Sequence, residues 1–588
     1  METEARTALP GGGFLIDRAT PGDVFTPEDL NEEQRMVRKA ASDFFAREVA
    51  PRAEAIEKQD WDVTKMLLRR LGEMGFLAPD LPEAYGGGGM DSLASLVIAE
   101  RISAGSFSVT YGAHVGIGML PIAFFGTEEQ KRRYLPAMAR AEKIGAYALT
   151  EPTAGSDALS IRTRAVLSPE GQHYLLSGQK QFITNSAIAD VFVTYAKIDG
   201  EHFTAFIVDR DTEGLTIGDE EHKLGVKGSS TRSLFFENAK VPVANLLGEV
   251  GKGHRVAFNI LNLGRFKLGA WCMGAAKYAL HQAVGYAVER RQFGKPIAEF
   301  GLIRQKLAQI VIGTYVAESM VYRTGGLVES AVGSIRGSEE VVRALEEYAI
   351  ESSINKVFAS EMLDRVVDEV VQIYGGYGYI EDYPAARAYR DSRINRIWEG
   401  TNEINRMLIV DMLTKRAMRG RLNLLPAIQR VVGDLTELSP SAEAADGPLA
   451  EEAALVEAIK KAALFAAGVA VQKHLDQLEH QQEILAWIAD LVTEAFAAES
   501  ALLRAQKAHR RGAERADLFA AMTRAHVHAA MPRVEATARH VLAATDEGDA
   551  LRTALSGLRR LLRYTPANLV ALQREVADAV IRAGGYPE

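Results

Sequence analysis

The chain has 588 residues, a formal net charge of −9 and 25% charged residues. Domains typically hold about 100–200 residues, so this length excludes a single core, and the acidic balance excludes the basic surface typical of nucleic-acid-binding proteins. The one cysteine, Cys272, excludes an intrachain disulfide and suits a reducing compartment.

Nothing in the first residues indicates export. The segment METEARTALPGGGFLIDR contains Glu2 and Glu4 and has no long apolar core, unlike signal and transit peptides. No apolar run is judged long enough to span a bilayer, which takes about 20 residues. We therefore expect a cytoplasmic protein whose contact with membranes is at most peripheral.

Residues 26–143 are predicted to form an N-terminal helical domain. Thr26 followed by Pro27 is a typical helix start, because proline fits the first turn of a helix. Thr127 and Gln130 form a predicted capping box, in which two side chains satisfy free backbone N–H groups at a helix start.

Residues 144–252 are predicted to form a β domain. Stretches such as DVFVTYAKI and HFTAFIVD are rich in β-branched and aromatic residues, and Gly, Asp and Asn separate them, which is typical of short strands. The absence of strand–helix alternation and of a glycine-rich dinucleotide fingerprint argues against a Rossmann domain.

Helical periodicity then predicts a bundle over residues 253–434. Residues 435–457 contain Pro, Gly and Ser but no Lys or Arg, which is typical of a linker. Residues 458–588 are rich in Ala and Leu and predict an extra helical domain. Within it, the basic amphipathic stretch 551–563 could either contact a membrane or pack its leucines inward. The expected fold class is α+β, mostly α.

The stretch YRDSRINRIWEGTNEINR, residues 389–406, carries the main candidate for catalysis. The first helix should end near Trp398, since Gly400 permits backbone conformations that other residues avoid, and Thr401 is a good N-cap for a second helix. Glu399 then lies at a corner beside an indole, where an apolar neighbour would raise the pKa of its carboxyl. The alternative is an ordinary exposed carboxylate near a helix N-terminus.

This stretch resembles the C-terminal signature of the acyl-CoA dehydrogenase family, and AYALTEPTAGSD, residues 146–157, resembles its flavin-binding segment. The similarity extends from about residue 31 to the C-terminus and is strongest to the very-long-chain type, which has an extra C-terminal domain. The resemblance implies FAD-dependent α,β-dehydrogenation of acyl-CoA to trans-2-enoyl-CoA in fatty-acid β-oxidation. Long acyl chains and an electron-transfer flavoprotein as electron acceptor are also implied.

The chemistry needs a base for the proton next to the carbonyl, donors for the thioester oxygen, and a hydride acceptor that no amino-acid side chain provides. By resemblance Glu399 is the base, FAD is the acceptor, and the Glu399 backbone N–H holds the thioester oxygen together with a flavin hydroxyl. Trp398 packs near the flavin ring.

The resemblance also implies a set of FAD contacts. Phe182 stands where the family often has Trp, so stacking on the flavin there should differ in detail. Within one subunit the implied contacts are Tyr147, Leu149, Thr150, Ser156, Phe182, Thr184, Trp398, Thr401 and Glu403.

A second group of implied contacts belongs to the cofactor of a neighbouring subunit, which predicts a homodimer. Arg290 suits a phosphate because its planar fork pairs with two oxygens. Gln292 and Phe293 follow it, and Gln372 and Gly376, in QIYGG, approach the adenosine part.

For the substrate, Asn262, Arg265, Ser156 and Gly400 match substrate-contacting positions, although the family commonly has an acidic residue in place of Asn262. The apolar run YGAHVGIGMLPIAFF lies in the segment that closes the tail pocket in relatives, so the resemblance implies that it lines the acyl tail, with Gly116 and Gly118 opening the pocket. Glycine weakens a helix by roughly 0.5–1 kcal/mol, so these two residues indicate either such a cavity or tight helix packing.

Other chemistries find no support. No HExxH, CxxC, P-loop or GxSxG motif is present, and the twelve His residues show no metal-ligand spacing, so no metal is expected. Three alternatives stay open: an oxidase that passes electrons to oxygen, a non-catalytic flavoprotein scaffold, and a helical binding module without cofactor.

Overall fold

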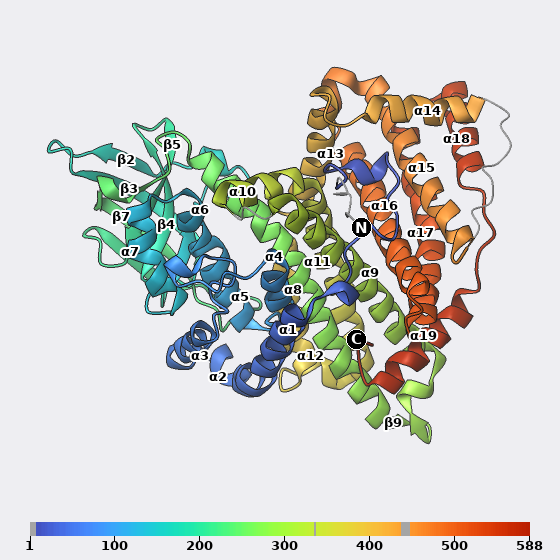
Figure 1. The fold of residues 1–588 in the computed structure, drawn as a ribbon, viewed down its shortest axis with the longest axis horizontal. Helices are drawn as coiled ribbons and strands as arrows, with labels where there is room; N and C mark the ends of the chain where they lie inside the picture. The colour runs from blue at the N-terminus through green and yellow to red at the C-terminus, as the bar shows by residue number, and fades with distance from the viewer. Residues whose placement is uncertain (1–7, 334–336, 437–446) are drawn as a thin grey trace, which may run out of the picture.

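The computed structural model describes residues 8–333, 337–436 and 447–588. Figure 1 shows a sheet domain at the left, a block of long helices in the middle and a second helical block at the right. This architecture confirms the predicted class, a mostly helical α+β fold with an extra helical domain.

Some of the N-terminal helices lie against the strands, and others lie beside the central helices (Figure 1). Both predicted helix starts are present, because the side chains of Thr26 and Thr127 take part in capping boxes. The helices are α1 (Glu32–Phe44), α2 (Ala53–Glu57), α3 (Trp61–Glu73), α4 (Ser92–Arg101), α5 (Ser106–Gly112), α6 (Leu120–Phe125) and α7 (Glu128–Ala139).

By length and composition alone, the helical stretch Ser106–Phe125 could cross a membrane. The expectation that no apolar run is this long was therefore wrong. Most of this stretch is buried inside the protein. Its middle part, Ala113–Gly118, is a π-helical turn, a form that often occurs at functional sites. The apolar character of the stretch is explained by its place in the core.

The β domain holds one sheet with strand order β6-β7-β3-β2-β4-β5-β8, and β1 pairs in parallel with β4. The pairing of β3 with β7 is irregular between Lys180 and Ile183. Such a bulge redirects side chains, and Phe182 lies within it with a φ of 60°. The strands are β1 (Gly145–Ala148), β2 (Arg164–Leu167), β3 (His173–Thr184), β4 (Val191–Ile198), β5 (His202–Asp209), β6 (Leu215–Glu220), β7 (Thr231–Pro242) and β8 (Leu246–Leu247).

The central bundle is built on long helices that carry the candidate site. A small hairpin, β9 (Arg291–Gln292) with β10 (Lys295–Pro296), joins the first two helices. The helices are α8 (Gly253–Glu289), α9 (Gly301–Val332), α10 (Ser338–Glu347), α11 (Ala349–Tyr374), α12 (Pro384–Ser392) and α13 (Asn402–Met418).

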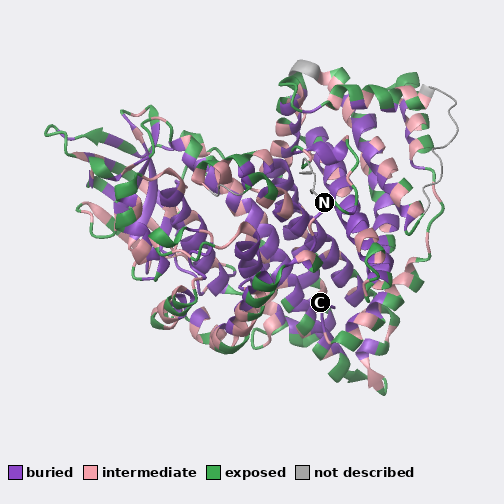
Figure 2. Ribbon diagram, viewed as in Figure 1, coloured by how far each residue is buried: buried purple, intermediate pink, exposed green. Residues whose placement is uncertain are grey.

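The extra helical block shares a core with the central bundle. One contiguous cluster of buried side chains includes residues of α8, α9 and α11 together with residues of α15, α16 and α17, and Figure 2 shows these facing surfaces as buried. Within the cluster, the centre of the Phe14 ring lies 4.7 Å from that of the Phe496 ring. The helices are α14 (Leu424–Thr436), α15 (Ala450–His474), α16 (Gln482–Arg510), α17 (Ala516–Thr545), α18 (Gly548–Leu561) and α19 (Leu569–Ala583).

The predicted linker, residues 435–457, was too long. Helix α14 continues to Thr436 and α15 begins at Ala450, while residues 437–446 lie outside the described residues. Glu451 and Glu452 occupy the first turn of α15, where acidic side chains favour the positive end of the helix dipole. The lack of Lys and Arg in the predicted linker therefore reflects, in part, the acidic first turn of a helix.

The leucines of the stretch 551–563 pack inward. Leu558 and Leu562 are buried in the shared core, and Leu555 packs against it. The apolar face of α18 is thus occupied by protein.

Candidate active site

Glu399 lies at the corner predicted from the sequence, between the turn Arg393–Arg396 and the start of α13. Both Glu399, with a φ of 56°, and Gly400, with a φ of 78°, have left-handed backbone conformations. The Thr401 side chain caps α13 by accepting a hydrogen bond from the Ile404 N–H at 3.3 Å. A non-glycine residue in this conformation is strained, which is a feature that clusters at functional sites.

The corner is held by two buried cationic side chains. Arg265, on α8, donates from Nε to the Glu399 carbonyl at 3.1 Å. Lys356, on α11, donates from Nζ to the Gly400 carbonyl at 2.8 Å. The amide of Asn405 also donates to the Gly400 carbonyl at 2.8 Å, so the backbone oxygens of the corner are fully engaged.

The Glu399 carboxyl points into the protein and packs on the backbone of α8 at Gly264. A Cβ placed at Gly264 would lie 2.8 Å from Glu399 Oε1 and closer still to Oε2. Oε2 is buried and has no hydrogen-bond partner among the described residues. Burial raises the pKa of the Glu399 carboxyl to about 7, against the opposing effect of Arg265 and Lys356. The alternative of an exposed helix-end carboxylate is therefore wrong.

This carboxyl borders a narrow apolar cavity of about 50 Å³. A pocket whose walls are mostly apolar, with a carboxyl at its border, suits an apolar ligand with one reacting atom. The cavity is lined by Ser95, Ala99, Val109, Tyr111, Gly112, Ala113, Val115, Gly116, Ile117, Thr184, Leu263, Gly264, Lys267, Trp271, Trp398 and Glu399.

The two glycines expected to open a tail pocket have different roles. Gly116 lines the cavity, and a Cβ there would meet no described atom within 4 Å. At Gly118 a Cβ would lie 2.7 Å from the Gly145 carbonyl carbon and 2.8 Å from the Ala113 oxygen. The prediction for Gly118 as a substrate residue was therefore wrong, because this glycine lets the helix approach the start of β1.

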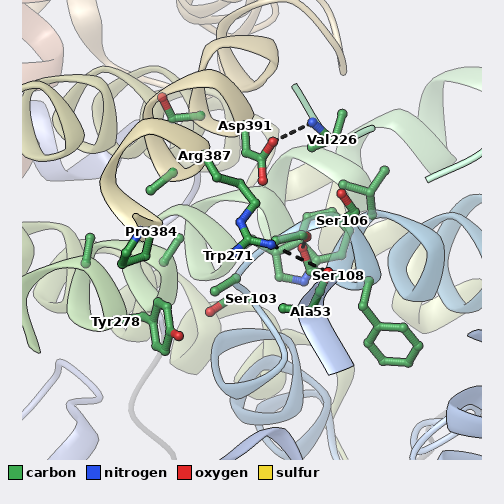
Figure 3. A pocket seen from close by; sticks show the side chains of 18 of the residues that line it. Ala53, Ser103, Ser106, Ser108, Val226, Trp271, Tyr278, Pro384, Arg387 and Asp391 are labelled. Atoms are coloured by element: carbon green, nitrogen blue, oxygen red, sulfur yellow. Dashed lines mark hydrogen bonds between the residues drawn. The ribbon is translucent and has the colours of Figure 1, made fainter. Parts of the chain in front are cut away.

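A second cavity, of about 130 Å³, lies beyond the first and shares Val109, Trp271 and Trp398 with it. Figure 3 shows its interior, where Arg387 extends from α12 and Asp391 accepts a hydrogen bond from the Val226 N–H at 2.5 Å. The Trp271 indole lies against Gly112, since a Cβ at Gly112 would overlap its ring. Trp271 therefore forms a wall between the two cavities.

Several residues expected to contact FAD gather on the β-domain side of Glu399. Thr184, at the end of β3, lines the same cavity as Glu399, and Phe182 is 56% exposed. Tyr147, on β1, has a buried hydroxyl without a described hydrogen-bond partner, and burial holds the pKa of this phenol well above its usual value. The exposed ring of Phe182 and the hydroxyl of Thr184 at the pocket fit a planar heteroaromatic cofactor.

The other predicted residues on this side vary in exposure. Leu149 is buried, whereas Ser156 is exposed on the turn after β1. Thr150 is half-buried and Glu403 is exposed in the first turn of α13. Of these, only the exposed and half-buried side chains can reach a bound group without rearrangement.

Asn262 and Arg265 are brought directly to the corner. Arg265 donates from Nη1 to the Asn262 side-chain oxygen at 2.8 Å and is 5% exposed. These contacts give Arg265 a role in holding Glu399, and the predicted substrate contact of both residues stays a prediction.

The remaining predicted residues form a separate surface cluster. Arg290, Gln292, Phe293 and Gly376 all line one open cavity of about 880 Å³, which shares no lining residue with the cavity of Glu399. Phe293 is 93% exposed on the β9–β10 hairpin. Gln372 is exposed near the end of α11 but does not line this cavity.

Comparison with known proteins gives the family. Four family models match in order: the acyl-CoA dehydrogenase N-terminal domain over residues 31–142, its middle domain over 146–239, and its C-terminal domains over 251–414 and 458–560. A probable acyl-CoA dehydrogenase of Bacillus subtilis is 48% identical over the full length of both chains. The chain belongs to the acyl-CoA dehydrogenase family.

Other acyl-CoA dehydrogenases agree with this. A crystal structure of the acyl-CoA dehydrogenase complexed with FAD from Bacillus anthracis has a TM-score of 0.97 and 49% identity, covering 99% of this chain and 100% of that chain. The human mitochondrial very long-chain specific acyl-CoA dehydrogenase is 38% identical over 68% of this chain and 61% of the human protein. Acyl-CoA dehydrogenases are oxidoreductases that use FAD, as the sequence motifs predicted.

Three residues of this acyl-CoA dehydrogenase site were not predicted from the sequence. Gly264 lies within the motif NLGRF, and a glycine inside a long helix is itself a sign of close packing. Lys356 and Trp271 gave no local signal, because their roles depend on contacts with residues far away in the sequence.

Proposed function

We propose that this acyl-CoA dehydrogenase removes the α proton of an acyl-CoA thioester with Glu399 and forms a trans-2-enoyl-CoA. The observation that carries the proposal is the buried Glu399 carboxyl, whose pKa of about 7 matches a general base at neutral pH. FAD, when bound, supplies the acceptor for the hydride that leaves the β carbon. One hydrogen therefore leaves the α carbon as a proton that Glu399 accepts, and the other leaves the β carbon as a hydride.

The residues around Glu399 contribute binding and orientation. Arg265 and Lys356 hold the corner through backbone oxygens, so the carboxyl stays available for the proton. The Glu399 N–H is the proposed donor to the thioester oxygen. Phe182, Thr184 and Tyr147 would hold the flavin on the β-domain side. The apolar walls exclude water from the proton transfer.

The substrate is proposed to be a long-chain acyl-CoA. The cavity that borders Glu399, here called the proximal cavity, has a volume of only about 50 Å³. The second cavity, on the other side of Trp271 and here called the distal cavity, adds about 130 Å³. An apolar cavity of about 150 Å³ can hold a six-carbon ring, so the volume of the distal cavity suits several methylenes, with Arg387 and Asp391 also among its lining residues. A long tail would pass Trp271, whose indole N–H makes no described hydrogen bond that fixes it. The similarity to very long-chain specific relatives supports this substrate class.

The proposed electron acceptor is an electron-transfer flavoprotein, and the proposed role is fatty-acid β-oxidation in the cytoplasm. A solved structure described as the electron transferring flavoprotein of Acidaminococcus fermentans includes a chain 36% identical to this one, with a TM-score of 0.60 over 66% of this chain. An oxidase is the second candidate, since the prolyl acyl carrier protein oxidase AnaB is 28% identical with a TM-score of 0.59 over 65% of this chain.

The proposed assembly is a homodimer with one FAD per subunit. The exposed cluster around Arg290 and Phe293 lies apart from the pocket of Glu399, which supports contact with the cofactor of a neighbouring subunit. Exposed apolar surface commonly marks a site where a protein binds a partner or a ligand. The exposed ring of Phe293 at this open cavity therefore fits such a contact.

The test is anaerobic titration of the FAD-loaded enzyme with butyryl-, octanoyl- and palmitoyl-CoA, followed by flavin bleaching. The proposal expects complete bleaching by long chains in the wild type and none within the same time in Glu399→Gln. Bleaching of both proteins at equal rates would exclude Glu399 as the base. Peroxide formation in air at the rate of turnover would favour the oxidase.

A further inference from the structure

The corner that carries Glu399 is connected to the extra helical block by a continuous series of contacts. The series begins at Lys356, which is fully buried on α11. Its Nζ donates to the Gly400 carbonyl at 2.8 Å and to the Asn402 side-chain oxygen at 2.6 Å. Lys356 thus ties the backbone just after Glu399 to the first residue of α13.

Asn402 also contacts Glu361, which forms an ion pair with Arg406. Its side-chain amide donates to Glu361 Oε1 at 2.9 Å. Arg406, one turn further along α13, donates from Nη1 and Nη2 to the two oxygens of Glu361 at 2.7 and 3.0 Å. Two parallel hydrogen bonds of this kind fix the orientation of the guanidinium as well as its position.

The last residue in this series of contacts is Asp490, which lies on the extra helical block. The third side of the guanidinium, Nε of Arg406, donates to Asp490 on α16 at 2.8 Å. Glu361, Arg406 and Asp490 all border a cavity of about 650 Å³ between the two helical blocks. The ion pairs between these three side chains therefore lie where the two helical blocks meet.

The corner needs such support because it is strained. Glu399 and Gly400 are both in the left-handed region, and a non-glycine residue in that region is strained and persists only where its surroundings hold it. A carboxyl displaced by about 1 Å can lose about 10²-fold in rate. Contacts that hold this backbone therefore bear on the reaction rate.

We propose that Asp490 is a positioning residue for Glu399, so that the extra helical block holds the catalytic corner through Arg406, Glu361, Asn402 and Lys356. The proposal rests on the proposed role of Glu399 as the base. It gives the extra block a part in the reaction in addition to its part in the core.

The experiment compares Asp490→Ala with Asp578→Ala in the full-length, FAD-loaded enzyme. Asp578, on α19, pairs with Arg304 on α9, so it also joins the extra block to the bundle but has no described contact with the corner. The two aspartates are similarly exposed, at 41% for Asp490 and 49% for Asp578. A role as a simple link between the blocks would affect both variants alike.

We expect Asp490→Ala to lower kcat and the rate of anaerobic flavin bleaching at saturating acyl-CoA by roughly tenfold, with KM within about twofold of the wild type. Asp490→Glu, which keeps the carboxylate, should recover part of the rate, and Asp578→Ala should keep the wild-type rate. Wild-type bleaching in Asp490→Ala, or an equal loss in Asp578→Ala, would overturn the proposal. If Asp490→Ala does not fold, the same comparison is made with Asp490→Asn, which keeps the side-chain volume.

The outcome is separable from that of the proposed function. Full activity of Glu399→Gln would remove Glu399 from the reaction whatever Asp490 does. An inactive Glu399→Gln together with a fully active Asp490→Ala would leave the base in place and refute only the positioning role.

Discussion

Replacing Gly264 by Ala offers a direct test of the carboxyl position, because the substituent would enter the space that Glu399 occupies. The added Cβ would lie 2.5 Å from Glu399 Cδ and 2.8 Å from Oε1. Unstrained contacts between such atoms are about 3.5 Å, so the carboxyl must retreat by about 1 Å. A displacement of that size predicts a loss of about 10²-fold in kcat.

The same substitution should not destabilise the fold. Alanine is favoured over glycine in a helix interior by roughly 0.5–1 kcal/mol, and the clash falls on the end of a flexible side chain. Gly285→Ala is the matched control, since it lies on the same helix and a Cβ there meets no described atom within 4 Å.

The assay measures kcat by dye reduction, flavin content by absorbance, and the melting temperature of both variants. We expect similar melting temperatures and flavin contents, with the loss of kcat confined to Gly264→Ala. If Gly264→Ala turns over within threefold of Gly285→Ala, the carboxyl does not act from the position seen here, and the reasoning fails.

Four further predictions follow from the site. Glu399→Gln should keep its flavin absorbance and lose about 10²–10⁴-fold in kcat, and activity near the wild-type level would contradict the assignment. Because the base acts when ionised and its pKa in the free protein is about 7, kcat/KM should fall about tenfold per pH unit below neutrality and level off above it; a flat profile in dye-reduction assays would count against this. Trp271→Ala should raise the kcat/KM ratio of palmitoyl- to butyryl-CoA, whereas Ala275→Leu, which fills only the distal cavity, should lower it without affecting butyryl-CoA; unchanged ratios would show that the tail does not pass Trp271. Arg290→Ala should weaken FAD retention on gel filtration while light scattering still gives a dimer, and a wild-type FAD content would remove Arg290 from the cofactor site.

The parts of the site that follow local rules could be predicted from the sequence. The turn at Gly400 and the cap at Thr401 depend on neighbouring residues only, so the corner was located correctly. Gly118 was misassigned because glycine in a helix permits either a cavity or a close contact, and only the position of β1 decides between them. Lys356 could not be found, since its partners Gly400 and Asn402 are more than 40 residues away in the sequence.

The core that joins the extra block to the bundle also bears on how the chain folds during synthesis. Phe14, near the start of the chain, packs on Phe496, and residues of α8, α9 and α11 complete the same cluster. A nascent chain that ends before α15 therefore leaves the apolar faces of the bundle uncovered, and such exposed surfaces are prone to aggregation and chaperone binding. Protease cleavage within α9 should persist in ribosome-bound chains until α16 has emerged; protection of α9 at shorter lengths would show that the bundle folds independently.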